Sequence, residues 1–153
     1  KKKMKETGAL LAGEMSGHVC FADNYLGFDD AIFAAGRILQ IVAQSNQKVS
    51  EMLADLPVTA YTPEIRIDCP DDKKFEIVSE LTEFFRKQYE VIDIDGVRIN
   101  FNDGWALIRA SNTQPVLVLR FEAETQSRLK ELVGIIKKQV DHYQPVVQFD
   151  YQA

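Results

Sequence analysis

The sequence has few cysteines, and the two that it has are not arranged as a site. Cys20 and Cys69 lie in unrelated contexts without C-x-x-C spacing, which argues against a disulfide framework and a cysteine-based zinc site. Reduced, buried thiols are the expected state, because free cysteine packs as a small hydrophobic residue. Such thiols suit a reducing cytoplasm, which is the location that the sequence predicts.

Long apolar runs are also missing. No stretch approaches the roughly 20 consecutive apolar residues that a membrane span needs. The lysines that open the chain resemble the start of a signal peptide, but Glu6, Gly8 and Glu14 interrupt the apolar run that should follow. We therefore expect no membrane partner.

The chain carries no excess of positive charge. Its 18 lysines and arginines stand against 23 aspartates and glutamates, for a net charge of −5. Sequence-independent nucleic-acid binding needs a positive surface, so no nucleic-acid partner is expected. A small local anion site remains compatible with this balance. At 46% apolar and 27% charged residues, the composition is that of a globular chain and excludes a disordered one.

The first part of the chain predicts short strands and one long helix. The expected elements are a buried strand at 9–13, a strand at 19–22, a helix at 31–44 and a short helix at 50–56. Helix 31–44 is apolar on more than one face and therefore needs cover on more than one side. Asp29 and Asp30 stand before it, where carboxylates complement the helix dipole and its unsatisfied amides.

After a linker at 58–63, the second part alternates between strands and helices. The expected elements are strands at 64–69, 91–94, 97–101, 105–110 and 116–122, with helices at 70–89 and 125–143. Helix 70–89 has an apolar stripe made of Phe75, Val78, Leu81, Phe85 and Tyr89. This order predicts an α+β fold, an antiparallel sheet with two helices on one face. Trp105 is expected in the core, and Arg98 and Arg120 are expected to face solvent or pair with acids.

The first candidate site is the loop between the last two strands. Arg109, Ser111, Asn112 and Thr113 place a guanidinium, two hydroxyls and an amide within five residues. A phosphate group prefers this set of donors, which loop amides complete. The alternative is a polar β-turn whose Ser and Asn side chains bond their own backbone.

The second candidate is the segment from Glu14 to His18. On an extended backbone Glu14, Ser16 and His18 would project to one side, and such alternating groups suit the vicinal hydroxyls of a sugar. A purely structural loop is the alternative. A Ser–His hydrolase is disfavoured because no strand–elbow–helix glycine pattern surrounds Ser16. A metal site would need more ligands than this segment offers.

The two segments together resemble the α-D-phosphohexomutase superfamily, and within it the bacterial phosphomannomutase/phosphoglucomutase branch. Residues 13–18 (GEMSGH) resemble the sugar-recognition loop of the third domain of that family. Residues 109–122 (RASNTQPVLVLRFE) resemble the phosphate-binding loop of its fourth domain, and residues 95–98 (DGVR) and 104–105 (GW) also match. The resemblance covers essentially the whole chain. It implies that 1–57 is the back part of an incomplete α/β third domain and that 58–153 is a TATA-binding-protein-like fourth domain.

The resemblance also implies a reaction. Enzymes of this family interconvert hexose 6-phosphates and hexose 1-phosphates through a phosphoserine, with Mg²⁺ as cofactor and a hexose 1,6-bisphosphate as intermediate and activator. By resemblance, Glu14, Ser16 and His18 hold the sugar hydroxyls of a mannose or glucose phosphate. By the same resemblance, Arg109, Ser111, Asn112 and Thr113 hold the phosphate that is not reacting.

The sequence departs from the full family pattern. It contains no T-A-S-H-N serine loop and no D-G-D-x-D-R metal loop. We therefore expect a C-terminal portion that has no catalytic residue or metal ligand, is inactive alone and needs the N-terminal domains as partners. Its apolar segments within 9–43 are expected to be exposed or to self-associate. The alternative is a stand-alone, non-catalytic module that binds a phosphorylated ligand or a protein.

Overall fold

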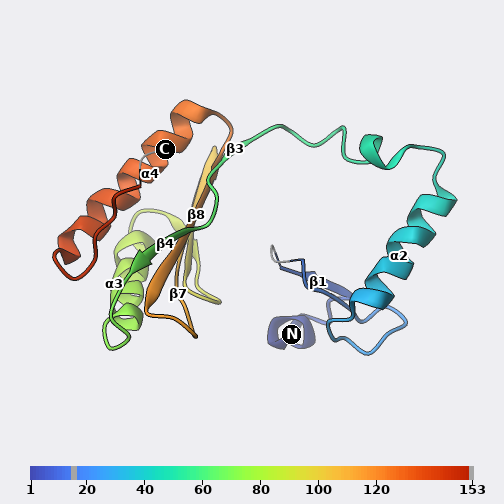
Figure 1. The fold of residues 1–153 in the computed structure, drawn as a ribbon, viewed down its shortest axis with the longest axis horizontal. Coiled ribbons are helices and arrows are strands. Elements are labelled where there is room, and N and C mark those ends of the chain that lie inside the picture. The colour runs from blue at the N-terminus through green and yellow to red at the C-terminus, as the bar shows by residue number, and fades with distance from the viewer. Residues whose placement is uncertain (15–16, 152–153) are drawn as a thin grey trace. The chain divides into compact units, whose positions relative to one another are not determined.

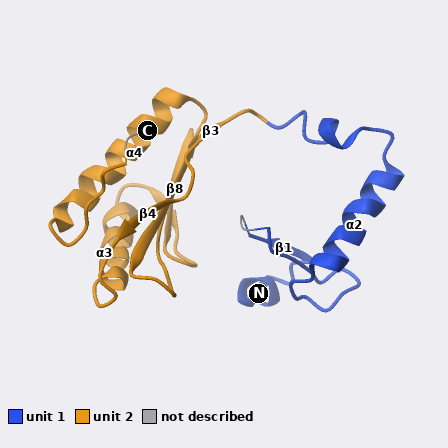
Figure 2. Ribbon diagram, viewed as in Figure 1, with its two compact units in different colours: residues 1–56 blue, residues 57–153 orange. Residues whose placement is uncertain are grey.

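The structure is a computed structural model, and it describes residues 1–14 and 17–151. The chain divides into two compact units, residues 1–56 and 57–153 (Figure 2). Each unit is described by itself below.

Unit 1 is a β-hairpin followed by a long helix (Figure 1). Its elements are α1 (Lys2–Thr7), β1 (Leu11–Gly13), β2 (Val19–Phe21), α2 (Ala31–Gln44) and a 3-10 turn, η1 (Val49–Glu51). The two strands are antiparallel, with Ala12 opposite Cys20. The predicted helix at 31–44 is confirmed with the same bounds.

Asp30 explains why α2 begins where it does. Its Oδ1 accepts hydrogen bonds from the backbone N–H groups of Ile32 and Phe33, both at 2.9 Å, so two otherwise unpaired amides of the first turn are satisfied. The Tyr25 hydroxyl donates to the other carboxylate oxygen at 2.6 Å, and the Tyr25 ring stacks on Phe33. The Tyr25 hydrogen bond, followed by that from Phe33, holds the pKa of Asp30 below its ordinary value.

The apolar surface of unit 1 is largely uncovered. No residue of α2 is buried, and Ile32 is 87% exposed. The expectation of a buried strand at 9–13 is wrong, because β1 lies in a two-stranded sheet and Leu11 is 58% exposed. The expected helix at 50–56 is reduced to η1 followed by turns. These short elements have too few neighbours within the unit to bury their apolar side chains.

Unit 2 is an antiparallel sheet with two helices on one face (Figure 1). Its strands are β3 (Ala60–Tyr61), β4 (Ile65–Asp68), β5 (Glu90–Ile92), β6 (Val97–Phe101), β7 (Gly104–Ala110) and β8 (Val116–Ala123), and its helices are α3 (Lys74–Arg86), α4 (Gln126–Val140) and the 3-10 turn η2 (Asp141–Tyr143). The strand order is β3-β8-β7-β6-β5, and β4 also pairs with β8. The α+β prediction is confirmed.

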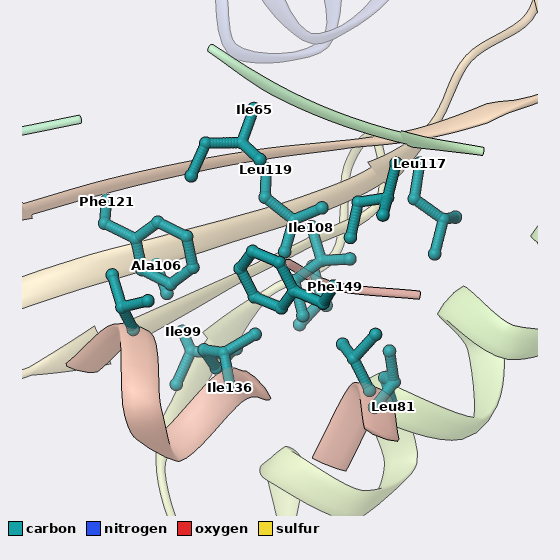
Figure 3. Close-up of a cluster of buried hydrophobic side chains, with 14 of the residues drawn as sticks. Ile65, Leu81, Ile99, Ala106, Ile108, Leu117, Leu119, Phe121, Ile136 and Phe149 are labelled. Carbon is teal, nitrogen blue, oxygen red and sulfur yellow. The ribbon is translucent and has the colours of Figure 1, made fainter. Parts of the chain in front are cut away.

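The core lies between the sheet and the two helices (Figure 3). Alternation along the strands sends one set of side chains to the helices: Ile65, Ile99, Ala106, Ile108, Leu117, Leu119 and Phe121. Leu81 of α3 and Ile136 of α4 meet them from the other side. The residues between the core positions, among them Arg66, Arg98 and Arg109, occupy the opposite face of the sheet.

Four expectations for unit 2 need correction. The expected linker at 58–63 contains β3, because Ala60 and Tyr61 pair with the end of β8. Helix α3 is shorter than 70–89, and one member of its predicted stripe lies outside the core: Val78, Leu81 and Phe85 are buried as expected, but Phe75 is 56% exposed whereas Lys74 is 4% exposed. Trp105 is half-buried on the sheet face away from the helices, since its neighbour Ala106 faces the core.

The C-terminal tail is part of the core. Val147 and Phe149 are buried, and the ring of Phe149 packs against that of Phe121 with centroids 6.5 Å apart. The Lys137 ammonium donates a hydrogen bond to the carbonyl of Phe149, which joins the tail to α4. In the part of the chain that the structure describes, no helix is long and apolar enough to cross a membrane.

Candidate functional site

Arg109 leads into the first candidate loop from the end of β7. It pairs with Val118 of β8, and its side chain is 35% exposed. Gly96, in the turn between β5 and β6, lies directly against it: a Cβ on Gly96 would sit 2.6 Å from the Arg109 Cβ. Asp95 places a carboxylate oxygen 3.4 Å from Arg109 Nη1. The turn at 95–96 therefore holds the backbone and the guanidinium of Arg109 in place.

Ser111 organises the loop that follows. It is buried, and its hydroxyl oxygen accepts hydrogen bonds from the backbone N–H groups of Thr113, at 3.3 Å, and Gln114, at 3.1 Å. The polar-turn alternative thus describes Ser111 correctly, while its hydroxyl hydrogen stays available for donation. Asn112 and Thr113 are exposed at the tip of the loop.

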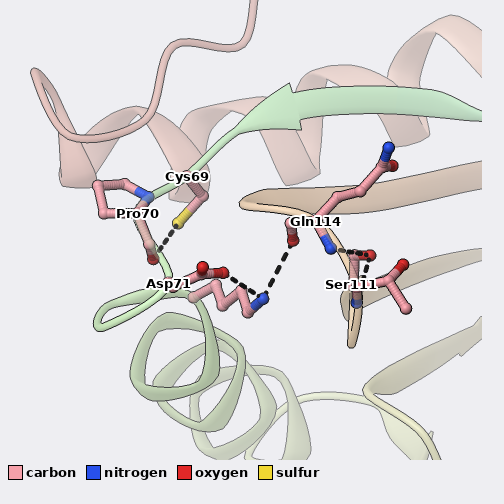
Figure 4. A network of polar contacts seen from close by, with 7 residues as sticks. Cys69, Pro70, Asp71, Ser111 and Gln114 are labelled. Carbon is pink, nitrogen blue, oxygen red and sulfur yellow. Dashed lines mark hydrogen bonds and ion pairs between the residues drawn. The ribbon is translucent and has the colours of Figure 1, made fainter.

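The far side of the loop is anchored through Gln114 (Figure 4). The buried ammonium of Lys74 donates to the Gln114 carbonyl at 3.0 Å and to Asp71 Oδ1 at 2.5 Å. Arg66 donates to the side-chain oxygen of Gln114 at 2.6 Å. The backbone N–H of Cys69 donates to the next carbonyl, that of Pro115, at 2.8 Å. Helix α3 and strand β4 thus both hold this loop.

Both cysteines are free and buried, as expected. Burial raises the pKa of the Cys69 thiol, although the nearby Lys74 ammonium opposes this shift. The Cys69 Sγ lies 3.8 Å from the carbonyl oxygen of Pro70 (Figure 4). Because reactive cysteines have a lowered pKa, Cys69 is a packing residue.

Arginines gather on the sheet face around Arg109. They lie in two neighbouring rows across the strands: Arg98, Leu107 and Arg120 form one, and Arg109, Val118 and Arg66 form the other. Arg98 also stacks over the Trp105 ring, 4.8 Å from its centroid. Four arginines therefore lie on this face beside the loop, and two of them are paired with acids: Arg66 with Glu64 at 2.8 Å and Arg109 with Asp95 at 3.4 Å. Arg66 and the two rows were not predicted from the sequence. The alternation of residues along the strands would have placed these arginines on the same face of the sheet.

The second candidate loop closes the β1–β2 hairpin. The backbone N–H of Glu14 donates to the His18 carbonyl at 2.9 Å, and the N–H of Gly17 donates to the Glu14 carbonyl at 3.0 Å. Gly17 has a φ of +89°, which favours glycine at this position. These two hydrogen bonds bring Glu14 close to Gly17 and His18. Ser16 lies outside the described residues.

The turn brings Glu14 and His18 to one open pocket of about 540 Å³ within unit 1. Asp29 lines the same pocket, and its Oδ2 lies 2.5 Å from His18 Nδ1. Its other oxygen accepts from the backbone N–H of Val19 at 3.3 Å. The expectation that both acids of the Asp29–Asp30 pair serve the helix end holds for Asp30 only. No sequence spacing signalled the contact of Asp29 with His18.

The described residues of the two loops do not form a metal site. Within residues 1–14 and 17–151, no three His, Cys, Asp or Glu side chains are placed to hold a metal ion together. The chemistry that the described residues offer is hydrogen bonding and charge: a carboxylate and an imidazole in unit 1, and a guanidinium with hydroxyl and amide donors in unit 2.

Comparison with known proteins defines the class to which this arrangement belongs. Residues 64–139 match the family model described as "Phosphoglucomutase/phosphomannomutase, C-terminal domain", and residues 1–60 match "alpha/beta/alpha domain III" of the same family. The two matches cover most of both units. The chain belongs to the phosphoglucomutase/phosphomannomutase family, within the α-D-phosphohexomutase superfamily.

Individual relatives agree with the family match. A phosphomannomutase/phosphoglucomutase of Pseudomonas putida is 43% identical over 152 residues, which are 99% of this chain and 33% of the relative. A phosphoglucomutase of Neisseria gonorrhoeae is 44% identical over 92% of this chain and 31% of the relative. The crystal structure of a phosphoglucomutase/phosphomannomutase family protein from Burkholderia thailandensis superposes with a TM-score of 0.79 at 35% identity, over 98% of this chain and 32% of that chain. The chain spans about one third of the length of these relatives.

Proposed function

We propose that this chain is the C-terminal portion of a phosphomannomutase/phosphoglucomutase, an isomerase that interconverts hexose 6-phosphates and hexose 1-phosphates. The proposal is supported by the names of the relatives that the chain resembles over nearly its whole length. In this proposal, residues 1–57 are the back part of the third domain of such an enzyme and residues 58–153 are its fourth. The compact units at 1–56 and 57–153 support that division.

The observation that carries the phosphate-binding role is the environment of Arg109. Its half-exposed guanidinium stands beside a loop rich in amides and hydroxyls and beside three further arginines of the same sheet face. A guanidinium donates two parallel hydrogen bonds to a phosphate, and loop amides and hydroxyls complete the cage. Arg109, Ser111, Asn112 and Thr113 bind the phosphate that is not reacting in this scheme.

The sugar-binding role belongs to Glu14, Ser16 and His18. Glu14 and His18 line one pocket, where a carboxylate accepts from sugar hydroxyls and an imidazole nitrogen donates or accepts. Asp29 Oδ2 accepts a hydrogen bond from Nδ1–H of His18, which leaves Nε2 for the substrate.

Positioning explains how such loops serve the reaction. Phosphoryl transfer depends mainly on alignment and on charge stabilisation, so binding energy from the remote phosphate and the sugar hydroxyls aligns the reacting end. In the parent enzyme a phosphoserine donates the phosphoryl group, Mg²⁺ supports the transfer and a hexose 1,6-bisphosphate is formed and reoriented. We assign neither the phosphoserine nor a metal ligand to this chain, and we expect it to be inactive alone.

The exposed apolar face of unit 1 supports the part of the proposal that concerns partners. Its segments within 9–43 either contact the N-terminal domains of the parent enzyme or self-associate, because large apolar patches are seldom left open to water. A cytoplasmic location is supported by the free cysteines.

The exposed apolar face of unit 1 also favours the second candidate function, a stand-alone module that binds a phosphorylated ligand or a protein partner. The gene sequence upstream of Lys1 separates them: a serine loop and a D-G-D-x-D-R loop there support the mutase.

An NMR titration of the 153-residue chain with mannose 6-phosphate tests the proposed sites. We expect amide signals around Arg109 and His18 to shift at millimolar ligand, and inorganic phosphate to shift only the first group. Arg109→Met should abolish the phosphate response, while Arg128→Met, which removes an arginine on the helical side, should preserve it. If neither loop responds to mannose 6-phosphate, glucose 1-phosphate or phosphate, the site assignment is wrong.

A further inference from the structure

Lys74 is the one charged residue among the buried side chains of the described chain. It is the first residue of α3, and it is 4% exposed, whereas its neighbour Phe75 is 56% exposed. The sequence pattern predicts the opposite arrangement, with Phe75 in the core. At the start of this helix an ammonium group, and not an aromatic ring, is therefore buried.

The buried ammonium contacts the phosphate loop. Lys74 Nζ donates to the Gln114 carbonyl at 3.0 Å and is paired with Asp71 Oδ1 at 2.5 Å (Figure 4). The N–H of Gln114 donates in turn to the Ser111 hydroxyl oxygen. A continuous path of two hydrogen bonds thus joins the Lys74 ammonium to a residue proposed to hold phosphate.

Stability alone does not account for a charge at this position. Burial of an ammonium is unfavourable unless it is paired, and an apolar residue of similar volume is often equally stable or more so in such places. The Gln114 carbonyl also accepts from the backbone N–H of Val116, at 2.8 Å, so it would keep a partner without Lys74. What the ammonium adds is a second, charged hydrogen bond to this carbonyl, which ties the end of the loop to the start of α3.

We propose that Lys74 is a positioning residue for the phosphate site: through the Gln114 carbonyl it holds the loop at 111–114 in the conformation that receives a phosphate monoester. The proposal rests on the phosphate-binding role proposed above for that loop. Arg66 supports Gln114 from the exposed side through its side-chain oxygen, so the two basic residues fix the same residue at two points. Lys74 itself does not touch the ligand.

The test compares Lys74→Met with Lys73→Met in the full chain. Methionine keeps the length of the side chain and removes the charge and the hydrogen bonds. Lys73 is the preceding lysine, is exposed and pairs with Glu76, so its replacement is a matched control. Amide NMR spectra without ligand, the affinity for inorganic phosphate and the thermal unfolding midpoint are measured for both variants.

We expect Lys74→Met to move the amide signals of Thr113 and Gln114 before any ligand is added. Its affinity for phosphate should fall about tenfold, in line with the loss of a charged hydrogen bond that fixes the loop. Its unfolding midpoint should stay close to that of the original chain. Lys73→Met should leave both the spectra and the affinity unchanged.

Other outcomes overturn the proposal in separable ways. If Lys74→Met keeps the loop spectrum and the affinity, Lys74 does not position the loop, although phosphate binding by the original chain still supports the proposed function. If the original chain binds no phosphate at this loop, the proposed function fails. If Lys74→Met does not fold, Lys74→Gln, a shorter and uncharged side chain that stays polar, is measured in its place, with the same shift of the loop amides and the same fall in affinity expected.

Discussion

The side chains of His18 and Asp29 are hydrogen-bonded in the wall of the pocket of unit 1, with Nδ1 of the imidazole 2.5 Å from Oδ2 of the carboxylate. One residue ends the hairpin turn, and the other stands just before α2. A carboxylate accepts hydrogen bonds, so the neutral imidazole carries its proton on Nδ1 and presents Nε2 as an acceptor. Asp29 thereby determines that Nε2, and not Nδ1, is the ring nitrogen available for a further hydrogen bond.

Replacement of Asp29 by Asn should remove this preference. The amide can donate as well as accept, so both tautomers of His18 become populated. Long-range ¹H–¹⁵N spectra at a pH where the ring is neutral measure the two forms. Asp23→Asn, which breaks the ion pair with Arg37 instead, is the control. The loss of stability in either variant should stay below about 1 kcal/mol, since both pairs are partly exposed. An unchanged tautomer in Asp29→Asn would contradict this role.

Gly96 should be intolerant of a side chain. Its φ is +78°, and a Cβ would come within 2.6 Å of the Arg109 Cβ. We expect Gly96→Ala to lower the free energy of unfolding by about 2–4 kcal/mol, from the left-handed backbone and the overlap together. Because the overlap is with the carbonyl oxygen of Ile108 and with the Cα and Cβ of Arg109, the variant should also weaken phosphate binding at temperatures where it is folded.

Gly134 provides the matched control for that substitution. It lies inside α4, and nothing stands within 4 Å of an added Cβ. Gly134→Ala should therefore stabilise the chain by about 0.5–1 kcal/mol, because glycine loses more backbone entropy in a helix than alanine does. Denaturant unfolding of both variants gives the comparison. Equal effects of the two substitutions would argue against the close approach at Gly96.

The C-terminal tail should be required for the stability of unit 2. Phe149→Ala removes a ring that is 1% exposed and packs on Phe121, so a loss of about 3–5 kcal/mol is expected. Val146→Ala in the same tail removes a side chain that is 45% exposed, and its effect should be much smaller. Chemical denaturation distinguishes the two. Similar small losses for both would mean that the tail is not part of the core.

Tyr143 should make the folded chain sensitive to high pH. Burial, followed by its 2.9 Å hydrogen bond to Glu80, raises the pKa of the phenol from 10.0 to about 12. The folded state therefore holds the proton more tightly than the unfolded state does. The contribution of Tyr143 to the free energy of unfolding is complete below pH 10 and is lost as the pH rises from 10 towards 12.

Denaturant unfolding across this alkaline range, together with phenolate absorbance, measures the effect. Tyr143→Phe has no titrating group at this position, so its stability should fall less steeply with pH than that of the original chain. Parallel pH profiles for the two proteins would show that Tyr143 does not titrate differently in the folded and unfolded states.

The exposed face of α2 should make the isolated chain self-associate. Ile32 is 87% exposed and Leu39 is 68% exposed. They lie on the same side of α2, because a separation of seven residues is about two helical turns. We expect sedimentation to show concentration-dependent association and a hydrophobic dye to bind. The double variant Ile32→Lys/Leu39→Lys should reduce both signals, whereas Gln40→Lys should not. A compact monomer without dye binding would remove the basis for this expectation.

The sequence by itself determined the elements whose signals are local. Helix α2 was predicted with its bounds because the Asp30 cap and the apolar periodicity that follows it act within a few residues. The sheet with two covering helices followed from strand alternation and from the Asp95–Gly96 turn. Both candidate loops were found because their donors are adjacent in the chain, although their roles as binding sites remain predictions.

Only the tertiary structure decided what depends on partners far apart in the chain. Lys74 is buried in place of Phe75 because it hydrogen-bonds the Gln114 carbonyl. This partner lies 40 residues away in the chain, so local spacing does not reveal it. β3 forms in an expected linker because the end of β8 offers it a partner. Asp29 pairs with His18 instead of serving the helix end. Local spacing carries no information about such contacts, since each one exists only after the chain has brought two distant segments together.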